Sequence, residues 1–381
     1  MHEVILSVGI DIGTSTTQLI FSRLTIENRA SSYTVPRISI VDKEVVYRSQ
    51  IYFTPLKSAT EIDAEAVKKI VRDEYQMAGM TPADLKTGAV IITGETARKQ
   101  NANDVLEALS DLAGDFVVAT AGPDLESVLS ARGAGTDAMS KEERMAIANI
   151  DIGGGTSNIA LYERGTLRGT SCLDIGGRLI KVQNGKITYI FHKIQELANK
   201  HGISVNIGDR ADPEQLMKVC RLMADQLAQA LHLAPQDGGH AGLYTNDGKP
   251  LPDTPAVQAV TYSGGVADCV YQSDETDLFR YGDIGVLLGR AIRENAALNQ
   301  IKRFQAVETI RATVVGAGTH ATDVSGSTIR YDRRQLPLKN VPVLKVSQED
   351  EASLETLKSS IRDQLPLRGL GPQQSWCGFR R

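Results

Sequence analysis

The 381-residue sequence has only four cysteines, and they are scattered: Cys172, Cys220, Cys269 and Cys377. They form no CxxC or CxxxxH pattern, so the sequence predicts neither a zinc knot nor a disulfide framework. This use of cysteine is typical of a protein from a reducing compartment. No long basic run is present, and 42 Lys and Arg residues stand against 46 Asp and Glu residues. A nucleic-acid partner is therefore not expected.

Long apolar runs are also missing. The first one, Val4 to Ile12, is interrupted by Gly9 and Asp11 and has no basic flank, so it is neither a signal peptide nor a membrane span. We therefore expect a cytoplasmic protein with no membrane partner. The six histidines include no ligand pair at helical spacing, so the sequence predicts no histidine metal site. No Gly-Lys-Ser/Thr stands at P-loop spacing, so a P-loop nucleotide site is excluded.

What the sequence does contain is a motif that occurs twice. Residues 9–16 read Gly-Ile-Asp-Ile-Gly-Thr-Ser-Thr, and residues 149–156 read Asn-Ile-Asp-Ile-Gly-Gly-Gly-Thr. In both copies a β-rich apolar run ends near an aspartate, a turn of small residues follows, and a second β-rich run begins. The repetition predicts an internal duplication and therefore two similar lobes.

Both turns can offer several backbone N–H groups to a phosphate chain, because glycine and small residues let the backbone approach closely. The candidate phosphate-binding residues are Gly13, Thr14, Ser15 and Thr16 in the first copy and Gly153, Gly154, Gly155 and Thr156 in the second. Asp11 and Asp151 precede the turns, where a carboxylate can orient the waters of a magnesium ion that bridges the phosphates. Each aspartate could instead only satisfy its own turn, but two matched copies favour the metal–nucleotide interpretation.

A dinucleotide-binding Rossmann loop is the main competitor, and it requires a helix directly after the glycine-rich turn. Residues 17–21 and 158–162 have the pattern of strands instead. Two later glycine pairs follow apolar runs: Gly264 with Gly265, and Gly316 with Gly318. Each pair could admit an adenosine close to the backbone, although a simple turn or tight helix packing is the alternative.

The rest of the pattern alternates between helix and strand. Between the two copies we expect a helix over 63–77 ending at Gly79, a strand over 87–93, and helices over 102–112 and 124–132, the last capped by Gly133. Residues 133–143 are expected to form a polar linker. Later, an apolar stripe predicts a core-facing helix over 214–233, strands are expected over 257–262 and 312–315, and a polar helix over 348–364.

Taken together, these motifs resemble the actin-like ATPase superfamily of actin, the Hsp70 chaperones and sugar kinases. The two phosphate motifs correspond to residues 11–16 and 151–156, the adenosine motif to 262–266, and the two connecting motifs to 122–127 and 312–318. The resemblance implies an α/β actin-like ATPase fold, with two duplicated lobes and a nucleotide cleft between them. It divides the chain into lobes at 1–140 and 141–330 and a tail at 331–381, which is short and atypical for the family.

The resemblance narrows to the ethanolamine ammonia-lyase reactivating factors through residues 7–23, 91–97, 114–119 and 149–158. It implies a chaperone-like, weak Mg-dependent ATPase that releases damaged cobalamin from ethanolamine ammonia-lyase, so that adenosylcobalamin can rebind. The implied cofactors are ATP or ADP and Mg²⁺, whereas adenosylcobalamin belongs to the partner lyase. Self-association and a place at the ethanolamine microcompartment are further implications.

The same resemblance assigns roles to single residues. It implies that Thr14 and Ser15 contact phosphate, that Asp11 and Asp151 hold magnesium through waters, and that residues 264–265 bind adenosine. In the first connecting motif, either Asp124 or Glu126 could accept a hydrogen bond from the attacking water. Their alternative roles are a helix N-cap for the first and a favourable first-turn charge for the second.

Two other functions are compatible with this scaffold. A small-molecule kinase would need an aspartate base facing a substrate hydroxyl in the cleft, and no unassigned aspartate stands in a convincing position. A nucleotide-gated scaffold or filament would use the nucleotide only to set its shape.

Overall fold

The computed structural model describes residues 2–13, 16–28, 38–58, 61–93, 101–110, 117–120, 122–236, 240–245, 249–272, 275–320, 343–345, 353, 355–359 and 376–378. The chain forms two compact units, Met1–Gly326 and Ser327–Arg381. In the second unit, β16 (Val343–Lys345) pairs in parallel with β17 (Trp376–Gly378). Both copies of the motif lie in the first unit.

The first copy belongs to a sheet with strand order β3-β2-β1-β7-β8. Its strands are β1 (His2–Ile12), β2 (Thr16–Asn28), β3 (Ile38–Arg48), β7 (Thr87–Ile92) and β8 (Val117–Thr120). β2 runs antiparallel to both of its neighbours, β1 and β3, and β7 and β8 then run parallel to β1. The short β4 (Tyr52–Phe53) pairs with β2 beside the turn.

The second copy belongs to a sheet with the order β11-β10-β9-β14-β15. Its strands are β9 (Ala146–Ile152), β10 (Ser157–Glu163), β11 (Thr166–Leu173), β14 (Ala259–Ser263) and β15 (Lys302–Arg303). Again three strands are antiparallel and two more run parallel to the first. The two sheets thus repeat one topology, which confirms the predicted duplication and the actin-like ATPase fold.

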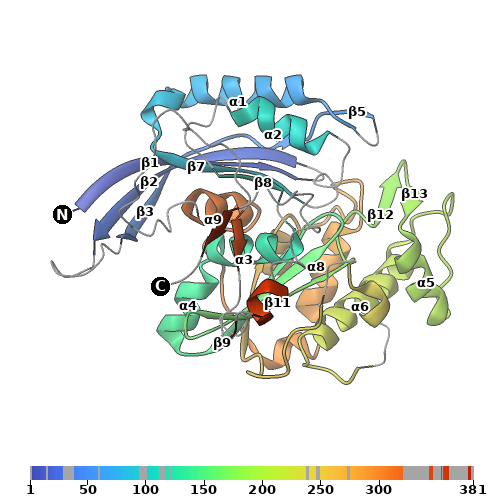
Figure 1. Cartoon of the computed structure of the whole chain (residues 1–381). Helices are drawn as coiled ribbons and strands as arrows, with labels where there is room; N and C mark the ends of the chain where they lie inside the picture. The colour runs from blue at the N-terminus through green and yellow to red at the C-terminus, as the bar shows by residue number, and fades with distance from the viewer. Residues whose placement is uncertain are drawn as a thin grey trace. The chain divides into compact units, whose positions relative to one another are not determined.

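Helices cover the outer face of each sheet, where the cores lie (Figure 1). On the first sheet, α1 (Ala64–Ala78) and α2 (Ala102–Ser110) bury Val67, Val71 and Val105 against Ile10 and Ile12. On the second sheet, a larger core includes residues of α6 (Pro213–Ala230) and α8 (Gly285–Glu294). The predicted stripe on α6 is confirmed, because Leu216, Val219, Cys220, Met223 and Leu227 are all buried.

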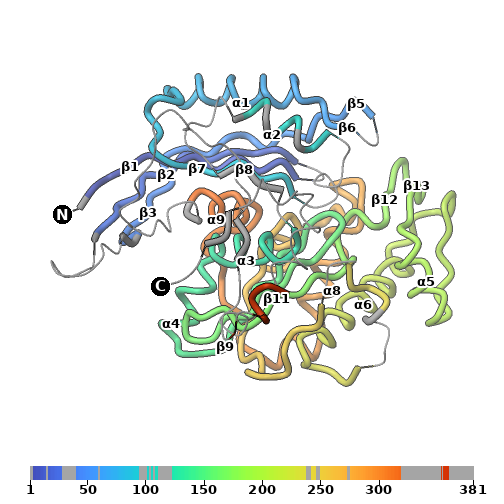
Figure 2. The backbone as a smooth tube through the Cα atoms, viewed as in Figure 1, coloured from blue at the N-terminus to red at the C-terminus, as the bar shows by residue number. Residues whose placement is uncertain are grey.

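Two helices that are far apart in the sequence pack side by side on the inner faces of the sheets (Figure 2). One is α3 (Pro123–Gly133), which packs against β9, β10 and β11, and the other is α9 (Ala312–His320), which packs against β1, β2 and β7. Their backbones approach so closely that a Cβ on Gly133 would lie 1.8 Å from the Ala312 carbonyl oxygen. A Cβ on Gly316 would lie 1.9 Å from the Leu129 carbonyl oxygen.

The remaining elements are short. They are β5 (Leu56–Ser58), β6 (Glu61–Ile62), η1 (Pro82–Asp84), α4 (Thr136–Glu143), β12 (Ile180–Gln183), β13 (Lys186–Ile190), α5 (His192–Lys200), η3 (His240–Leu243), α7 (Ala267–Tyr271) and η4 (Leu298–Gln300). Among the described residues, no helix combines the length and the apolar character that crossing a bilayer requires.

Three predictions about local structure are wrong. Residues 312–315 belong to helix α9 and not to a strand, because the small residues around the two valines allow a helix to pack closely on α3. Gly133 does not cap α3 but lies inside it, while Gly135 takes the left-handed conformation at φ 77°. The expected polar linker over 133–143 contains helix α4.

Other predictions are confirmed or lie outside the described part. Helix α1 begins after Asp63, whose carboxylate accepts a hydrogen bond from the Ala66 N–H, and it ends at Gly79, which has φ 66°. The strand predicted over 87–93 is β7. Most of the helix predicted over 348–364 lies outside the described residues, although 355–359 are helical. The lobe boundaries at 140 and 330 remain predictions.

Candidate functional site

The two copies of the motif form the same tight turn. The Gly13 N–H donates to the Thr16 carbonyl and the Gly153 N–H donates to the Thr156 carbonyl, both at 2.9 Å. Each turn therefore joins the two strands of an antiparallel hairpin. Thr14 and Ser15 lie outside the described residues. A Cβ on Gly155 would meet nothing within 4 Å, so this turn leaves room beside its backbone.

Asp11 and Asp151 occupy matching positions on β1 and β9. Both side chains are buried, and each accepts a hydrogen bond from a hydroxyl at the end of the neighbouring parallel strand. Thr93 Oγ1 donates to Asp11 Oδ1 at 3.0 Å, and Ser263 Oγ donates to Asp151 Oδ1 at 2.6 Å. These two hydroxyls were not among the residues predicted from the sequence. Their signal is an apolar strand ending in Thr-Gly or Ser-Gly, the same in both lobes.

The electrostatics of the two carboxylates favour a cation. Burial raises the pKa of Asp11 to about 7; the Thr93 hydrogen bond opposes this shift, and the nearby charge of Asp151 adds to it. Burial likewise raises the pKa of Asp151 to about 6, against the opposing Ser263 hydrogen bond. The carboxylates thus lie within electrostatic reach of each other, and a bound divalent cation would stabilise both in the charged form.

Two amide side chains add oxygen atoms to the same place. Gln18 lies directly across the hairpin from Asp11, and Asn158 lies directly across from Asp151. Both are buried, at 3% and 2% exposure, and among the described residues neither Gln18 Oε1 nor Asn158 Oδ1 has a hydrogen-bond partner. A buried polar atom without a partner is rare in folded proteins and points to a water, an ion or a ligand.

These donors fit a hydrated magnesium ion. Carboxylate and amide oxygens are the ligands that Mg²⁺ prefers, and it usually keeps several waters and binds through one or two carboxylates and phosphates. Within the described part of the chain, no group of three or more His, Cys, Asp or Glu side chains converges. The site thus offers two carboxylates and leaves the other positions to water and to a ligand.

The glycines predicted to contact adenosine differ in their surroundings. Gly264 has φ 85°, and a Cβ there would lie 2.5 Å from the Ile152 carbonyl oxygen, so only glycine fits. A Cβ on Gly265 would meet nothing within 4 Å. The adenosine contact of both residues stays a prediction.

Gly316 and Gly318 lie in helix α9, against protein backbone. Gly316 approaches Leu129 of α3, and Gly318 approaches Gly9 of β1. In addition, the Ser7 hydroxyl donates to the Gly318 carbonyl at 2.7 Å. Tight packing therefore accounts for Gly316, whereas a Cβ on Gly318 would come no closer than 3.5 Å to the Gly9 nitrogen. The nucleotide role of both glycines stays a prediction.

The two candidate acids of the first connecting motif lie in the first turn of α3. The N-cap of this helix is Gly122, so the alternative role of Asp124 as N-cap is wrong. The Asp124 carboxylate is 59% exposed; it accepts a hydrogen bond from the Thr170 hydroxyl and pairs with Lys249 at 3.3 Å. Glu126 is half-buried.

A segment that the phosphate motifs do not include holds the second turn. The Gly177 N–H donates to the Gly153 carbonyl at 3.0 Å, and the Arg178 N–H donates to the Gly154 carbonyl at 2.7 Å. A Cβ on Gly176 would lie 2.5 Å from the Gly154 carbonyl oxygen. The consecutive glycines at 176–177 are the sequence signal for this close approach.

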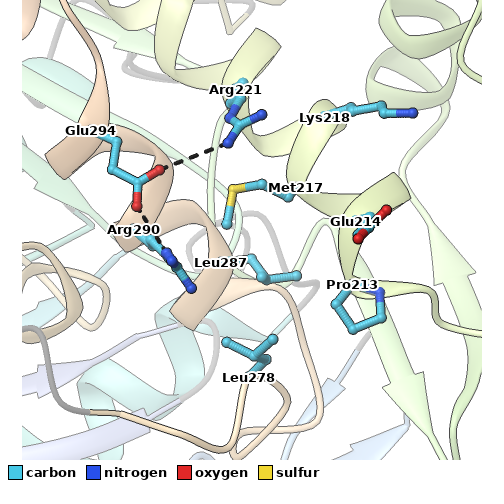
Figure 3. A pocket seen from close by; sticks show the side chains of 9 residues that line it. All are labelled: Pro213, Glu214, Met217, Lys218, Arg221, Leu278, Leu287, Arg290 and Glu294. Atoms are coloured by element: carbon cyan, nitrogen blue, oxygen red, sulfur yellow. Dashed lines mark hydrogen bonds and ion pairs between the residues drawn. The ribbon is translucent and has the colours of Figure 1, made fainter.

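A separate pocket of about 520 Å³ opens between α6 and α8 (Figure 3). Its lining residues are Pro213, Glu214, Met217, Lys218, Arg221, Leu278, Leu287, Arg290 and Glu294. Within this lining, Glu294 pairs with both Arg221 and Arg290. Of the predicted site residues that the structure describes, none lines this pocket.

Comparison with known proteins gives a consistent picture. The chain matches the family model described as "Ethanolamine utilisation protein EutA" over residues 3–374. It is 40% identical over 351 residues to the ethanolamine ammonia-lyase reactivase EutA of Salmonella typhimurium, covering 91% of this chain and 73% of that protein. The Escherichia coli reactivase EutA is also 40% identical, over 341 residues, which cover 89% of this chain and 72% of that protein.

Among solved structures, an Aquifex aeolicus member of the Ppx/GppA family is similar at 14% identity and a TM-score of 0.46. That match covers 82% of this chain and 97% of the other. Its sequence identity is far below that of the two reactivases.

Proposed function

Because the chain belongs to the EutA family of ethanolamine utilisation proteins, we propose that it is an ATP-dependent reactivase of ethanolamine ammonia-lyase. In this proposal it releases damaged cobalamin from the lyase, so that the lyase can rebind adenosylcobalamin. The observation that carries the nucleotide part is the matched pair of buried carboxylates, Asp11 and Asp151, each held by a strand-end hydroxyl.

In this proposal, different residues of the site contact the magnesium ion, the phosphates and the adenosine of Mg-ATP. Asp11 and Asp151 would hold the magnesium ion through waters, and the N–H groups of the turns at 13–16 and 153–156 would face the phosphates. The backbone at 264–265 would lie against the adenosine. When bound, the magnesium ion neutralises phosphate charge.

Weak hydrolysis would require an acid that accepts a hydrogen bond from the attacking water. We favour Glu126 for this role, because its side chain is half-buried whereas that of Asp124 is 59% exposed. Glu126→Gln should then lower ATP hydrolysis strongly while ADP binding persists. Asp124→Asn should have the smaller effect, and the opposite ranking would assign the role to Asp124.

Coupling to the lyase would use the contact between the two inner helices. A change in the angle between the sheets must shift α3 against α9, because each helix packs on a different sheet. Nucleotide binding can do work on the lyase only if the lyase binds the two angles with different affinities. Self-association and residence at the ethanolamine microcompartment belong to the same proposal.

The test mixes the protein with lyase that carries hydroxocobalamin or cyanocobalamin, adds adenosylcobalamin, and supplies or omits Mg-ATP. Lyase activity should return only when the protein and Mg-ATP are both present. Asp151→Asn should abolish the recovery, and Asp253→Asn, whose side chain is 94% exposed, should preserve it. Equal recovery without the protein would refute the proposal.

The two alternative functions have distinct outcomes in companion experiments. ADP release stimulated by a small hydroxylated molecule would favour a kinase. Pelleting of the protein on addition of ATP would favour a filament.

A further inference from the structure

We propose that Asn149 and Ser263 are positioning residues for Asp151, and that a buried chain of hydrogen bonds beginning at Thr136 fixes the orientation of this carboxylate. The inference deepens the proposed function and rests on it, because it concerns the same magnesium–nucleotide site. It gives a role to four polar side chains, Thr136, Asn149, Thr261 and Ser263, to which the sequence analysis assigned none.

The chain consists of four consecutive hydrogen bonds. The hydroxyls of Thr136 and Thr261 lie 2.7 Å apart, and Thr261 Oγ1 lies 3.0 Å from Asn149 Oδ1. Asn149 Nδ2 lies 2.9 Å from Ser263 Oγ, which in turn lies 2.6 Å from Asp151 Oδ1. The chain therefore runs from the start of helix α4 to the aspartate of the second motif.

The hydrogen bonds can point in one direction only. An ionised carboxylate only accepts, so Ser263 must give its single proton to Asp151. Ser263 Oγ then accepts from the Asn149 amide group, which leaves the Asn149 carbonyl oxygen to accept from Thr261. Because Thr261 has used its own proton, it must accept from Thr136. Every donor thus points toward Asp151.

All four side chains behind the carboxylate are completely buried. Thr136, Asn149, Thr261 and Ser263 each have 0% exposure, so bulk water cannot replace a missing member. Hydrogen bonds in such surroundings are stronger than in water, and a broken one leaves an unpaired polar atom. Asn149 Nδ2 also lies 3.5 Å from the Ser130 hydroxyl of helix α3, so the inner helix borders the chain.

The first lobe shows that the motif itself does not require this chain. Thr93 donates to Asp11 as Ser263 donates to Asp151, but the residue that matches Asn149 is Gly9. A Cβ on Gly9 would lie 2.3 Å from the Val314 carbonyl oxygen, so no side chain fits there. The second lobe thus adds an amide donor behind its serine hydroxyl, and Gly9 has no side chain that could supply one at the matching place in the first lobe.

The consequence concerns how well Asp151 can hold hydrated magnesium. Without the Asn149 amide, the Ser263 hydroxyl is free to rotate and to point its proton elsewhere. Asp151 then loses a donor that fixes one oxygen and leaves the other for the waters of the ion. Groups that orient metal-binding carboxylates typically change metal affinity by about 10-fold to 100-fold when removed.

The experiment titrates MgCl₂ into the full-length protein with ADP and measures the half-saturating magnesium concentration by calorimetry. Ser263→Ala and Asn149→Leu should each raise this concentration by about tenfold or more. Ser263→Thr should stay close to the wild type, because it keeps the hydroxyl and is the residue that the first lobe uses at this place. Thr261→Val, which keeps the side-chain shape, should give a smaller increase.

The matched control is Ser140→Ala, because Ser140 lies on the same helix as Thr136 and is equally buried, but its hydroxyl donates to the Met145 carbonyl. It should lower the melting temperature without changing the magnesium requirement. If Ser263→Ala and Asn149→Leu behave like this control, the network is only structural and the inference is wrong.

Other outcomes are equally decisive. Should Asn149→Leu not fold, Thr261→Val takes its place, and an unchanged magnesium requirement in that variant would overturn the inference. Should the wild-type protein show no magnesium-dependent ADP binding, the proposed function fails and the inference fails with it. If the wild-type protein shows magnesium-dependent ADP binding and the variants have the same magnesium requirement, the inference is wrong but the proposed function stands.

Discussion

The two sheets repeat one strand order, yet their inner faces are packed by different means. On the first sheet, Gly9 has no side chain, and helix α9 brings its backbone directly onto the strand. On the second sheet, the matching Asn149 joins a buried polar network that helix α3 borders. The same strand order therefore accommodates close helix–strand packing in the first lobe and a buried hydrogen-bond network in the second.

What the lobes share is as informative as what they do not. Both retain an aspartate, a strand-end hydroxyl, an amide across the hairpin and a glycine at the turn, namely Asp11, Thr93, Gln18 and Gly13 in one and Asp151, Ser263, Asn158 and Gly153 in the other. These residues face the site from both sides. Their repetition supports the proposed magnesium–nucleotide site, whereas close packing against Val314 explains the glycine at position 9.

The largest loss of stability is expected where the two inner helices, α3 and α9, cross. Gly316→Ala places a methyl group 1.9 Å from the Leu129 carbonyl oxygen, where backbone and not a flexible side chain must yield. We expect a loss of about 3 kcal/mol or more in the free energy of unfolding, measured by urea denaturation. Gly242→Ala is the control, because a Cβ there meets nothing within 4 Å. Equal stability of the two variants would contradict the helix crossing.

The next largest effect concerns the charge of the two buried carboxylates. The pKa of Asp11 is about 7 in the folded protein against an ordinary value of 3.8, so folding favours the protonated acid. The stability that this proton contributes is complete below the unfolded pKa and is lost as the pH rises through about 7. In magnesium-free buffer, Asp11→Asn should therefore raise the melting temperature by a few degrees at about pH 8.

This gain should shrink as the pH falls toward about 5, where the folded wild-type protein is itself protonated. Asp151→Asn should follow the same course but level off near pH 6, because the pKa of Asp151 is raised less. Mg-ADP should reverse the order by stabilising only the wild type. Melting temperatures recorded at several pH values test this course, and a gain that does not depend on pH would speak against buried ionisation.

Much of this architecture could be predicted because its signals are local. The Asp-Ile-Gly turn occurs twice, and Gly79 ends a helix with a clear apolar face, so the duplication and α1 could be found in the sequence. Helix α9 could not, because it is surrounded by α3 and the first sheet and has no polar face to reveal a helical period. Its adjacent valines therefore resembled a strand.

The candidate site was predicted in the same partial way. The aspartates and glycines stand together in the sequence, whereas Thr93 and Ser263 reach them only through the parallel pairing of distant strands. Sequence spacing does not reveal that pairing. The side-chain oxygens of Gln18 and Asn158, which lack a partner in the described part of the chain, depend on burial as well as on register, so they too emerge only from the structure.

A smaller effect is expected where the second turn is held by backbone. Gly176→Ala would bring a methyl group to 2.5 Å from the Gly154 carbonyl oxygen and 2.7 Å from the Gly155 nitrogen. The turn must then shift, which we expect to lower the free energy of unfolding by about 1–3 kcal/mol and to weaken ADP binding. Chemical denaturation and calorimetry measure the two effects, and unchanged ADP affinity would mean that this turn does not meet the phosphates.

The smallest effect is expected at the first turn, which is held by a side chain. Thr54 Oγ1 donates to the Gly13 carbonyl at 2.7 Å and lies 3.1 Å from the Thr17 hydroxyl. Thr54→Val keeps the shape but removes this bond, so the free energy of unfolding should fall by about 1 kcal/mol. Thr54→Ser should retain most of it. If the Thr54→Val variant were as stable as Thr54→Ser, the hydroxyl would not hold the first turn. The two lobes would then no longer differ in holding one turn by a side-chain hydrogen bond and the other by backbone hydrogen bonds.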